Sequence, residues 1–209
     1  MAIRRALTLQ NIVDAKIPKF PFTGEWYNAF GNPQSTGIWY IYGESGSGKT
    51  TFVLNLMKCL AQYTSGILLE SHEEGEISVS LQDGIKRFGL LEIKKKIFVV
   101  DESLTDMIER LSAQKSPEVV LIDSVEHSEF RDAGQVIELR RKFPNKLFIF
   151  IGQASGLNPR SKLGESILFI ANQKIWVEGY RAISRGRSFG PEKHLTLWDV
   201  EADKYWEKD

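Results

Sequence analysis

The segment GESGSGKT, residues 43–50, limits the possible folds of this chain more than any other stretch of its sequence. It follows an apolar run at 38–42 that predicts a buried strand, and it precedes a run at 50–63 whose apolar spacing predicts a helix. A glycine-rich turn in that position, ending in Lys and Thr, matches the P-loop pattern at every fixed position. Its glycines let successive main-chain amides turn toward phosphate oxygens at the start of the helix. The segment therefore predicts a nucleoside triphosphate site made of Gly43, Glu44, Ser45, Gly46, Ser47, Gly48, Lys49, Thr50 and Thr51.

A later strand end supplies the acidic residue that a metal-bound triphosphate needs. Four apolar residues at 119–122 predict a buried strand and place Asp123 at its carboxyl end, where open α/β sheets bind their ligands. We expect Lys49 to reach the β- and γ-phosphates of ATP, and we expect Thr50 and Asp123 to hold Mg²⁺. The alternative is that Asp123 only caps a turn. Because Ser124 follows it instead of a glutamate, a carboxylate that activates water must come from elsewhere or be absent.

Short β-rich runs alternate with longer amphipathic runs from residue 36 onward. This alternation predicts βαβ units, and therefore an α/β fold with a mostly parallel central sheet flanked by helices. Runs at 174–177 and 194–198 predict closing strands near the C-terminus. The other expected strands are 38–42, 67–69, 97–100, 119–122 and 147–151, and the expected helices are 50–63, 76–88, 104–113 and 133–143.

The length of 209 residues predicts one domain. We expect an aromatic and proline-rich lead-in at 1–35 that packs on the body, a core at 36–200, and a charged tail at 201–209. Lys plus Arg and Asp plus Glu both number 27, so any contact with nucleic acid needs a local basic patch. A single cysteine, Cys59, excludes an internal disulfide. The sequence has neither a signal peptide nor a membrane-spanning run, so we expect a cytoplasmic protein with no membrane partner.

The strand after the P-loop helix ends in an acidic turn with the sequence LESHEEG. A carboxylate beside the P-loop can hold the water that attacks a γ-phosphate. Glu70, Glu73 and Glu74 are all candidates for this role on the residues alone. The other interpretation is an acidic surface loop without a catalytic role.

Together these motifs resemble the RecA-like ATPase core, and most closely its RadA/Sms, DnaB-helicase and KaiC branches. The shared features are the P-loop, the acidic strand end, the VVLIDS strand, and Gln153 at the end of the run FIFIGQ. RadA-like proteins carry Ser-Gly-Glu-Glu-Ser where this chain has SHEEG, with His72 in place of the first Gly. The resemblance implies that Glu73 is the catalytic base, with Glu70 as the reserve, and that Gln153 senses the γ-phosphate. A polar strand end without this role is the alternative for Gln153.

The segment SRGRSFGP, residues 184–191, precedes the last predicted strand. RadA and DnaB carry Lys-x-Arg at this place and insert it into the ATP site of a neighbouring subunit. The resemblance therefore implies that Arg185 and Arg187 complete the site of a second copy, and that the chain assembles into a ring or filament. A solvated basic hairpin and a contact with DNA phosphate are the alternatives.

The resemblance covers residues 36–200 and implies an ATPase that binds and hydrolyses MgATP in DNA recombination, repair or replication, in a phage or mobile element. RecA-like proteins hold DNA at the position of the loop 154–164, where Arg160 and Lys162 give a weak signal for single-stranded DNA. The alternative function is a nucleotide-dependent assembly switch with slow or no hydrolysis, which the zero net charge favours. A small-molecule P-loop kinase fits the residues around Asp123 and Gln153 poorly.

Overall fold

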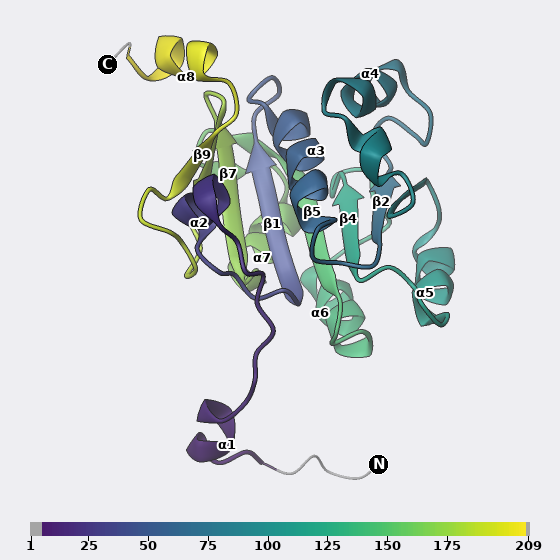
Figure 1. Ribbon diagram of the computed structural model, residues 1–209. Coiled ribbons are helices and arrows are strands. Elements are labelled where there is room, and N and C mark those ends of the chain that lie inside the picture. The colour runs from purple at the N-terminus through teal and green to yellow at the C-terminus, as the bar shows by residue number, and fades with distance from the viewer. Residues whose placement is uncertain (1–5, 208–209) are drawn as a thin grey trace.

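The computed structural model describes residues 6–207, and it shows a central sheet with helices on both faces (Figure 1). Residues 1–5 of the expected lead-in and 208–209 of the expected tail lie outside the described residues. The strands are β1 (Gly37–Gly43), β2 (Ile67–Ser71), β3 (Ile97–Val100), β4 (Val119–Asp123), β5 (Leu147–Ser155), β6 (Asn158–Pro159), β7 (Gln173–Glu178), β8 (Arg181–Ser184) and β9 (His194–Thr196). The helices are α1 (Leu9–Val13), α2 (Gly24–Phe30), α3 (Lys49–Leu60), α4 (Val79–Arg87), the 3₁₀ helix η1 (Leu90–Ile93), α5 (Leu104–Ser112), α6 (Ala133–Lys142), α7 (Lys162–Ile170) and α8 (Asp199–Trp206).

The strands lie in the order β3-β2-β4-β5-β1-β7-β8-β9, and the short β6 pairs with β5. From β3 to β7 along this path every strand is parallel to its neighbours. β8 and β9 then continue the sheet in the antiparallel direction. The predicted α/β class, with a mostly parallel sheet and antiparallel strands at the C-terminal end, is confirmed. One detail differs, because the expected closing strand at 174–177 is β7, which pairs in parallel with β1.

The register of the parallel strands brings several functional candidates to one edge of the sheet. Gly43 at the end of β1 pairs with Gln153 on β5 and with Val177 on β7. Asp123 at the end of β4 pairs with Ser71 at the end of β2. Because parallel strands share their carboxyl ends, the P-loop, Asp123 and Gln153 lie along the same edge, where open α/β sheets bind their ligands.

Both faces of the sheet are covered, which explains why its strands are apolar nearly throughout. On one face, α3 places Phe52 in a buried cluster with Trp39 and Ile41 of β1. On the other face, side chains of α5, α6 and α7 form a second cluster that includes Tyr40 of β1 and Ile167 of α7. Successive residues of β1 alternate between the two clusters, as the period of a strand requires.

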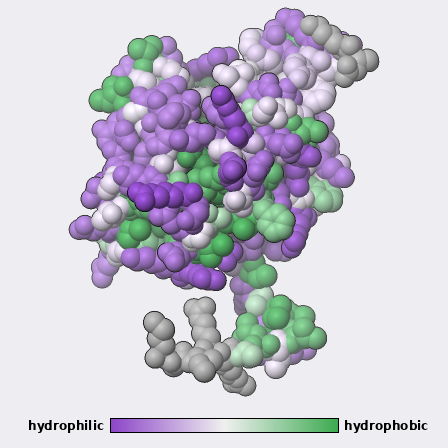
Figure 2. Space-filling model, turned by 180° about the vertical axis from the view of Figure 1, so that it is seen from behind, coloured by the Kyte–Doolittle hydropathy of each residue, from purple (hydrophilic) through white to green (hydrophobic). Residues whose placement is uncertain are grey.

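The lead-in divides into two parts. Phe20, Phe22 and Phe30 are buried in the cluster on the α3 face, and the rings of Phe20 and Trp39 meet edge to face with centroids 5.8 Å apart. The preceding helix α1 lies away from the body at the end of an extended segment (Figure 1). Leu9 and Val13 are strongly exposed there, and the helix forms the apolar cluster below the body in Figure 2.

Two segments differ from the predicted local structure. The expected functional loop at 154–164 is mostly regular: β5 continues to Ser155, β6 follows, and α7 begins after Ser161, whose hydroxyl caps it by accepting from the Gly164 amide at 3.0 Å. The start of the expected charged tail belongs to α8. The Tyr205 hydroxyl donates to Glu178, and the Trp206 ring N–H donates to the Gly179 oxygen at 3.1 Å, so that two aromatic residues dock this helix on the β7–β8 turn.

Within residues 6–207, none of the helices has both the length and the apolar character needed to span a bilayer.

Candidate functional site

The turn between β1 and α3 forms a phosphate cradle, residues 43–50, at the carboxyl edge of the sheet. Gly46 and Gly48 have positive φ angles of 79° and 100°, which residues with a side chain rarely adopt. Gly43 leaves no room for a side chain, because a Cβ there would overlap the main-chain oxygen of Val177 on the neighbouring strand. The helix begins at Lys49, so its positive amino end adjoins the cradle.

Lys49 places its ammonium group in the cradle. Its Nζ donates to the main-chain oxygens of Gly43 and Glu44, both at 2.8 Å, and to Oε1 of Gln153 at 3.4 Å. Burial lowers the pKa of Lys49, while nearby carboxylates, that of Glu73 first among them, act against this shift. A bound polyanion would favour the charged lysine in the same way. The structure therefore joins two predicted residues, Lys49 and Gln153, which are far apart in the sequence.

The cradle opens into a cavity of about 550 Å³. Its lining includes most of the predicted site: Ser45, Gly46, Gly48, Lys49, Thr50, Thr51, Glu73, Asp123 and Gln153. Ser47 is buried in the cradle, and its hydroxyl has no hydrogen-bond partner among residues 6–207. Buried hydroxyls are usually paired, and phosphate oxygens accept hydrogen bonds. A triphosphate in the cradle would therefore supply the missing acceptor for the Ser47 hydroxyl.

Asp123 ends β4 inside the cavity, which Thr50 also lines. Burial raises the pKa of the Asp123 carboxyl to about 6, and the negative charges of Glu73 and Glu74 add to the shift. A divalent cation would restore the ionised form. No group of three or more His, Cys, Asp or Glu side chains in the described part of the chain forms a metal site by itself. Mg²⁺ would therefore use Asp123 and Thr50 as protein ligands and take its remaining ligands from phosphate and water.

Glu70 is separated from the cavity by the sheet. Leu69 packs in the cluster on the α3 face and Leu68 in the cluster on the other face, so Glu70, two residues after Leu68, also lies on the far face. Its exposed fraction is 0%, and its carboxyl has the main-chain N–H of Glu102 as a weak hydrogen-bond partner. Burial raises the pKa of Glu70 to about 8, and the charge of Glu102 adds to the shift. Glu70 is absent from the lining of the cavity.

Glu73 and Glu74 both line the cavity, but their side chains have different partners. An oxygen of Glu74 accepts a hydrogen bond from the Ser78 hydroxyl at 2.7 Å, at the start of α4. Glu73 is exposed to solvent, and its carboxylate has no hydrogen bond or ion pair with any residue from 6 to 207. Of the three glutamates, Glu73 therefore has its carboxylate most available to a ligand in the cavity.

Glu126, which sequence motifs do not reveal, fixes the position of Gln153. The main-chain N–H of Gln153 lies 3.2 and 3.3 Å from the two carboxylate oxygens of Glu126. The Ser161 hydroxyl donates to the same carboxylate at 3.2 Å. Glu126 thus connects the segment after β4 with β5 and with the start of α7. Its only sequence signal is its place three residues after Asp123.

Arg185 and Arg187 follow β8 and lie outside the lining of the cavity. Arg185 donates to the Leu157 oxygen at 3.2 Å and to the Tyr42 hydroxyl at 3.3 Å, and its guanidinium lies 5.7 Å from the centre of the Trp176 ring. Arg187 is exposed and makes no hydrogen bond or ion pair with another described residue. Arg185 therefore supports the β5–β6 turn of its own chain, and Arg187 has no such role.

Two aromatic residues form a rim on the β7 side of the cavity. Tyr180 lies in the β7–β8 turn, where its N–H donates to the Ser47 oxygen in the cradle at 3.2 Å. Its ring meets that of Trp198 at an angle of 75° with centroids 5.6 Å apart. Both residues line the cavity, and Trp198 is 48% exposed. Sequence motifs do not reveal this rim, because single aromatic residues near strand ends usually belong to the core.

The sheet order, the cradle and the strand-end residues define the class of this chain: its fold is that of the RecA-like P-loop ATPases. No protein-family model matches the chain, and no curated protein matches it. These two negative results mean that the class rests on the fold and on the site.

Solved structures with the same fold come from different systems. A KaiC-like protein from the hyperthermophilic archaeon Pyrococcus horikoshii OT3 is 18% identical, with a TM-score of 0.57 over 86% of this chain and 98% of that chain. The flagellar accessory protein FlaH from Methanocaldococcus jannaschii is 12% identical, with a TM-score of 0.60 over 86% and 93% of the two chains. A type III secretion system ATPase from pathogenic bacteria is 11% identical, with a TM-score of 0.53 over 88% and 64%. At these identities the similarity establishes the fold alone, and it does not single out the RadA or DnaB branch.

Proposed function

We propose that this chain is an ATPase that binds MgATP in the cavity at the carboxyl edge of the sheet and hydrolyses it. One observation carries the proposal: the phosphate cradle, Asp123, Glu73 and Gln153 come from four separate segments of the chain and line one cavity. The RecA-like fold supports nucleotide binding at this edge.

In the proposed reaction, the cradle amides and Lys49 hold the β- and γ-phosphates, and Gln153 contacts the γ-phosphate beside Lys49. Glu73, whose carboxylate has no partner in the described chain, accepts a hydrogen bond from the attacking water and aligns it with the phosphorus atom. Mg²⁺ held by Thr50 and Asp123 would neutralise charge on the phosphate oxygens.

The strand order gives the bound nucleotide a direction. Asp123 follows β4 and Glu73 follows β2, and both strands lie on the β5 side of β1, so the γ-phosphate belongs on that side. The nucleoside must then extend toward β7, on the other side of β1, where Tyr180 and Trp198 line the same cavity. Exposed aromatic rings stack on nucleobases, so we propose that Tyr180 and Trp198 hold the base.

A contribution from the C-terminal arginines requires a second copy of the chain, because neither side chain lines the cavity of its own copy. Arg185 is bonded to Leu157 and Tyr42 within its chain, whereas Arg187 is exposed and without such contacts. We therefore propose that Arg187 acts on the γ-phosphate bound by a neighbouring copy, and that the chain assembles with itself as a ring or filament.

The proposed biological setting is DNA recombination, repair or replication, in a phage or mobile element, and it rests on the resemblance of the motifs. Arg160 and Lys162 are exposed near the start of α7 and are the candidates for single-stranded DNA. Two cations form a small phosphate-binding patch, and this observation favours the second candidate function, an assembly switch that binds ATP with slow or no hydrolysis.

ATP turnover in the presence of Mg²⁺, measured with and without single-stranded DNA, tests the proposal. We expect turnover by the wild type and by Lys95→Ala, a matched change at an exposed lysine, and none by Lys49→Ala. Stimulation by DNA supports the DNA role, and nucleotide binding without turnover supports the switch. Equal, measurable turnover by the wild type and Lys49→Ala would contradict the ATPase, and equal binding of ATP by the two proteins would contradict both candidates.

A further inference from the structure

The turn that carries Glu73, residues 72–76, is bonded to β4 through its main chain. The N–H groups of His72 and Glu73 both donate to the main-chain oxygen of Asp123, at 2.7 and 3.2 Å. These bonds fix the start of the turn beside the metal-site residue. The next regular element, α4, begins only at Val79, so the rest of the turn depends on other contacts.

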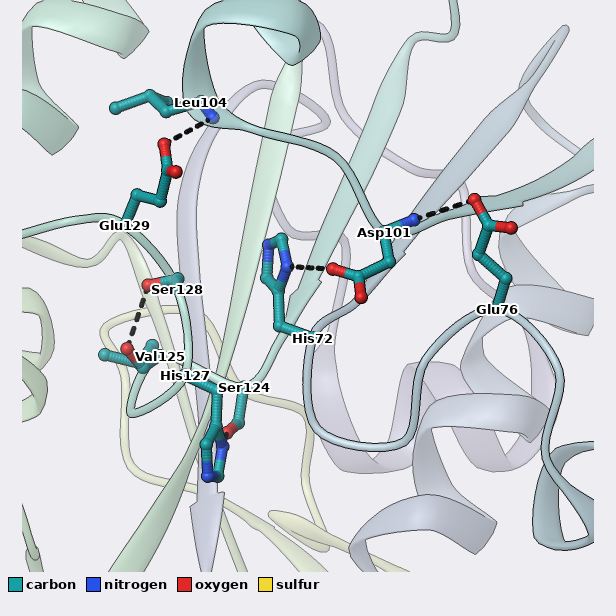
Figure 3. A network of polar contacts seen from close by, with 9 residues as sticks. All are labelled: His72, Glu76, Asp101, Leu104, Ser124, Val125, His127, Ser128 and Glu129. Atoms are coloured by element: carbon teal, nitrogen blue, oxygen red, sulfur yellow. Dashed lines mark hydrogen bonds and ion pairs between the residues drawn. The ribbon is translucent and has the colours of Figure 1, made fainter.

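A side chain closes the turn on its other side. Nδ1 of His72 lies 2.9 Å from Oδ1 of Asp101, the first residue after β3. A carboxylate only accepts hydrogen bonds, so Nδ1 carries the proton that is shared. The N–H of Asp101 donates in turn to Oε1 of Glu76 at 3.2 Å. Figure 3 shows Asp101 between His72 and Glu76, so that one residue bridges both ends of the turn.

The ring of His72 is shielded from water, and it does not line the cavity. Its side chain is 13% exposed, compared with 48% for Asp101, so its ring is largely shielded from competing water. His72 is absent from the lining of the cavity, whereas its neighbour Glu73 is part of it. Any effect of His72 on a bound nucleotide must therefore pass through Glu73 or through the main chain of the turn.

We propose that His72 is a positioning residue, which through its bond to Asp101 holds the turn 72–76 so that Glu73 faces the γ-phosphate. Glu73 has no partner of its own among the described residues, so its direction depends on the main chain of this turn. The inference rests on the proposed ATPase function and concerns the alignment of its water. Removing the bond should therefore slow hydrolysis while leaving the cradle, and with it the binding of ATP, intact.

Steady-state kinetics of four variants and one control variant tests the proposal. We expect His72→Ala and Asp101→Ala each to lower kcat about tenfold and to change KM for ATP less than about twofold. His72→Asn should keep kcat within about threefold of the wild type, because its amide N–H can donate to Asp101 in place of Nδ1. The double variant His72→Ala/Asp101→Ala should be no slower than either single alanine variant, since each single substitution already removes the same hydrogen bond. His194→Ala is the matched control, because that ring forms its hydrogen bond with the main-chain oxygen of Glu192, beside β9 and far from the turn 72–76 in the sequence.

Hydrogen exchange of the peptides covering residues 72–78 gives a readout that is independent of turnover. Exchange should be faster in His72→Ala and Asp101→Ala and close to wild type in His72→Asn. Full kcat in His72→Ala, or an equal loss in His72→Asn, would overturn the positioning role alone if the wild type hydrolyses ATP. A wild type that does not hydrolyse ATP would overturn the proposed function and the positioning role together. If His72→Ala does not fold, Asp101→Ala decides the question from the other side of the bond.

Discussion

The phosphate cradle and the C-terminal hairpin (residues 181–196, β8 and β9) differ in what one copy of the chain can do alone. The cradle meets Asp123 and Gln153 within one chain, because parallel strands end at one edge. The hairpin carries Arg185, which is bonded inside its own chain, and Arg187, which has no such partner and lies outside the cavity. The topology of one copy is thus enough to bring the candidate site together, while the proposed rate enhancement depends on assembly.

Arg187→Ala is expected to have a large effect on turnover, because in the proposed assembly it removes the part of the site that a neighbour supplies. We expect turnover to fall about 10³-fold, with affinity for ATP unchanged. Mixing this variant with Lys49→Ala should restore part of the turnover, because each protein retains what the other lacks. Arg131→Ala, at an exposed arginine outside the C-terminal hairpin, is the control. An absence of recovery at every mixing ratio would count against a shared site.

Glu73→Gln tests the part of the site that one copy of the chain supplies by itself. Loss of the carboxylate should lower kcat about 10²-fold and leave nucleotide binding in place, because the amide keeps the shape but accepts the proton of water poorly. Glu70→Gln is the matched variant, since Glu70 lies on the opposite face of the sheet. Single-turnover rates and binding should both be measured. If Glu70→Gln loses turnover while Glu73→Gln keeps it, the assignment of the two glutamates is wrong.

Trp198→Ala distinguishes the contribution of the base to ATP affinity from that of the phosphates. We expect affinity for ATP to fall about tenfold, because one stacking surface is lost. Affinity for inorganic tripolyphosphate, which has no base, should not change. Phe169→Ala, at a ring that is 84% exposed on α7, is the control for loss of a surface aromatic. An equal loss for both ligands would place the effect in the cradle instead.

Glu70→Gln should also change the pH dependence of stability, an effect on the free energy of unfolding and not on turnover. Burial raises the pKa of Glu70 from 4.5 to about 8. Between these values the folded state binds more protons than the unfolded state, so the free energy of unfolding falls as pH rises. From about pH 5 to about pH 8, the free energy of unfolding of the wild type should fall by about 3 to 4 kcal/mol more than that of Glu70→Gln. Urea unfolding at both pH values measures this, and parallel losses in the two proteins would contradict it.

The sequence predicts the sheet, and the place of Asp123 and Gln153 at its carboxyl edge, for a physical reason. An apolar run that ends in a polar residue marks the carboxyl end of a buried strand, and parallel pairing then brings such ends together. Asp123 and Gln153 lie beside the P-loop on this basis. The alternation within β2 also places Glu70 on the face of the sheet away from the cavity, but only once the strand is extended to Ser71, two residues beyond the predicted end.

The features that the sequence does not predict depend on contacts between distant segments. Trp198 lies on the rim because Tyr180 brings the β7–β8 turn to the cradle. The helix α8 depends on aromatic contacts with that same turn, so its charged composition alone suggests a tail. The bond between His72 and Asp101 joins the ends of two adjacent strands. The two residues are far apart in the sequence, so no local sequence pattern predicts their contact.

The proposed function depends above all on the binding of a triphosphate by the cradle through Lys49. Calorimetric titration of the wild type and of Lys49→Ala with a non-hydrolysable ATP analogue and Mg²⁺ tests it most directly. We predict one site per chain in the wild type and binding at least about thirtyfold weaker in Lys49→Ala, because a half-buried charged partner of the phosphates is removed. No binding by the wild type, or equal binding by the two proteins, would contradict the account.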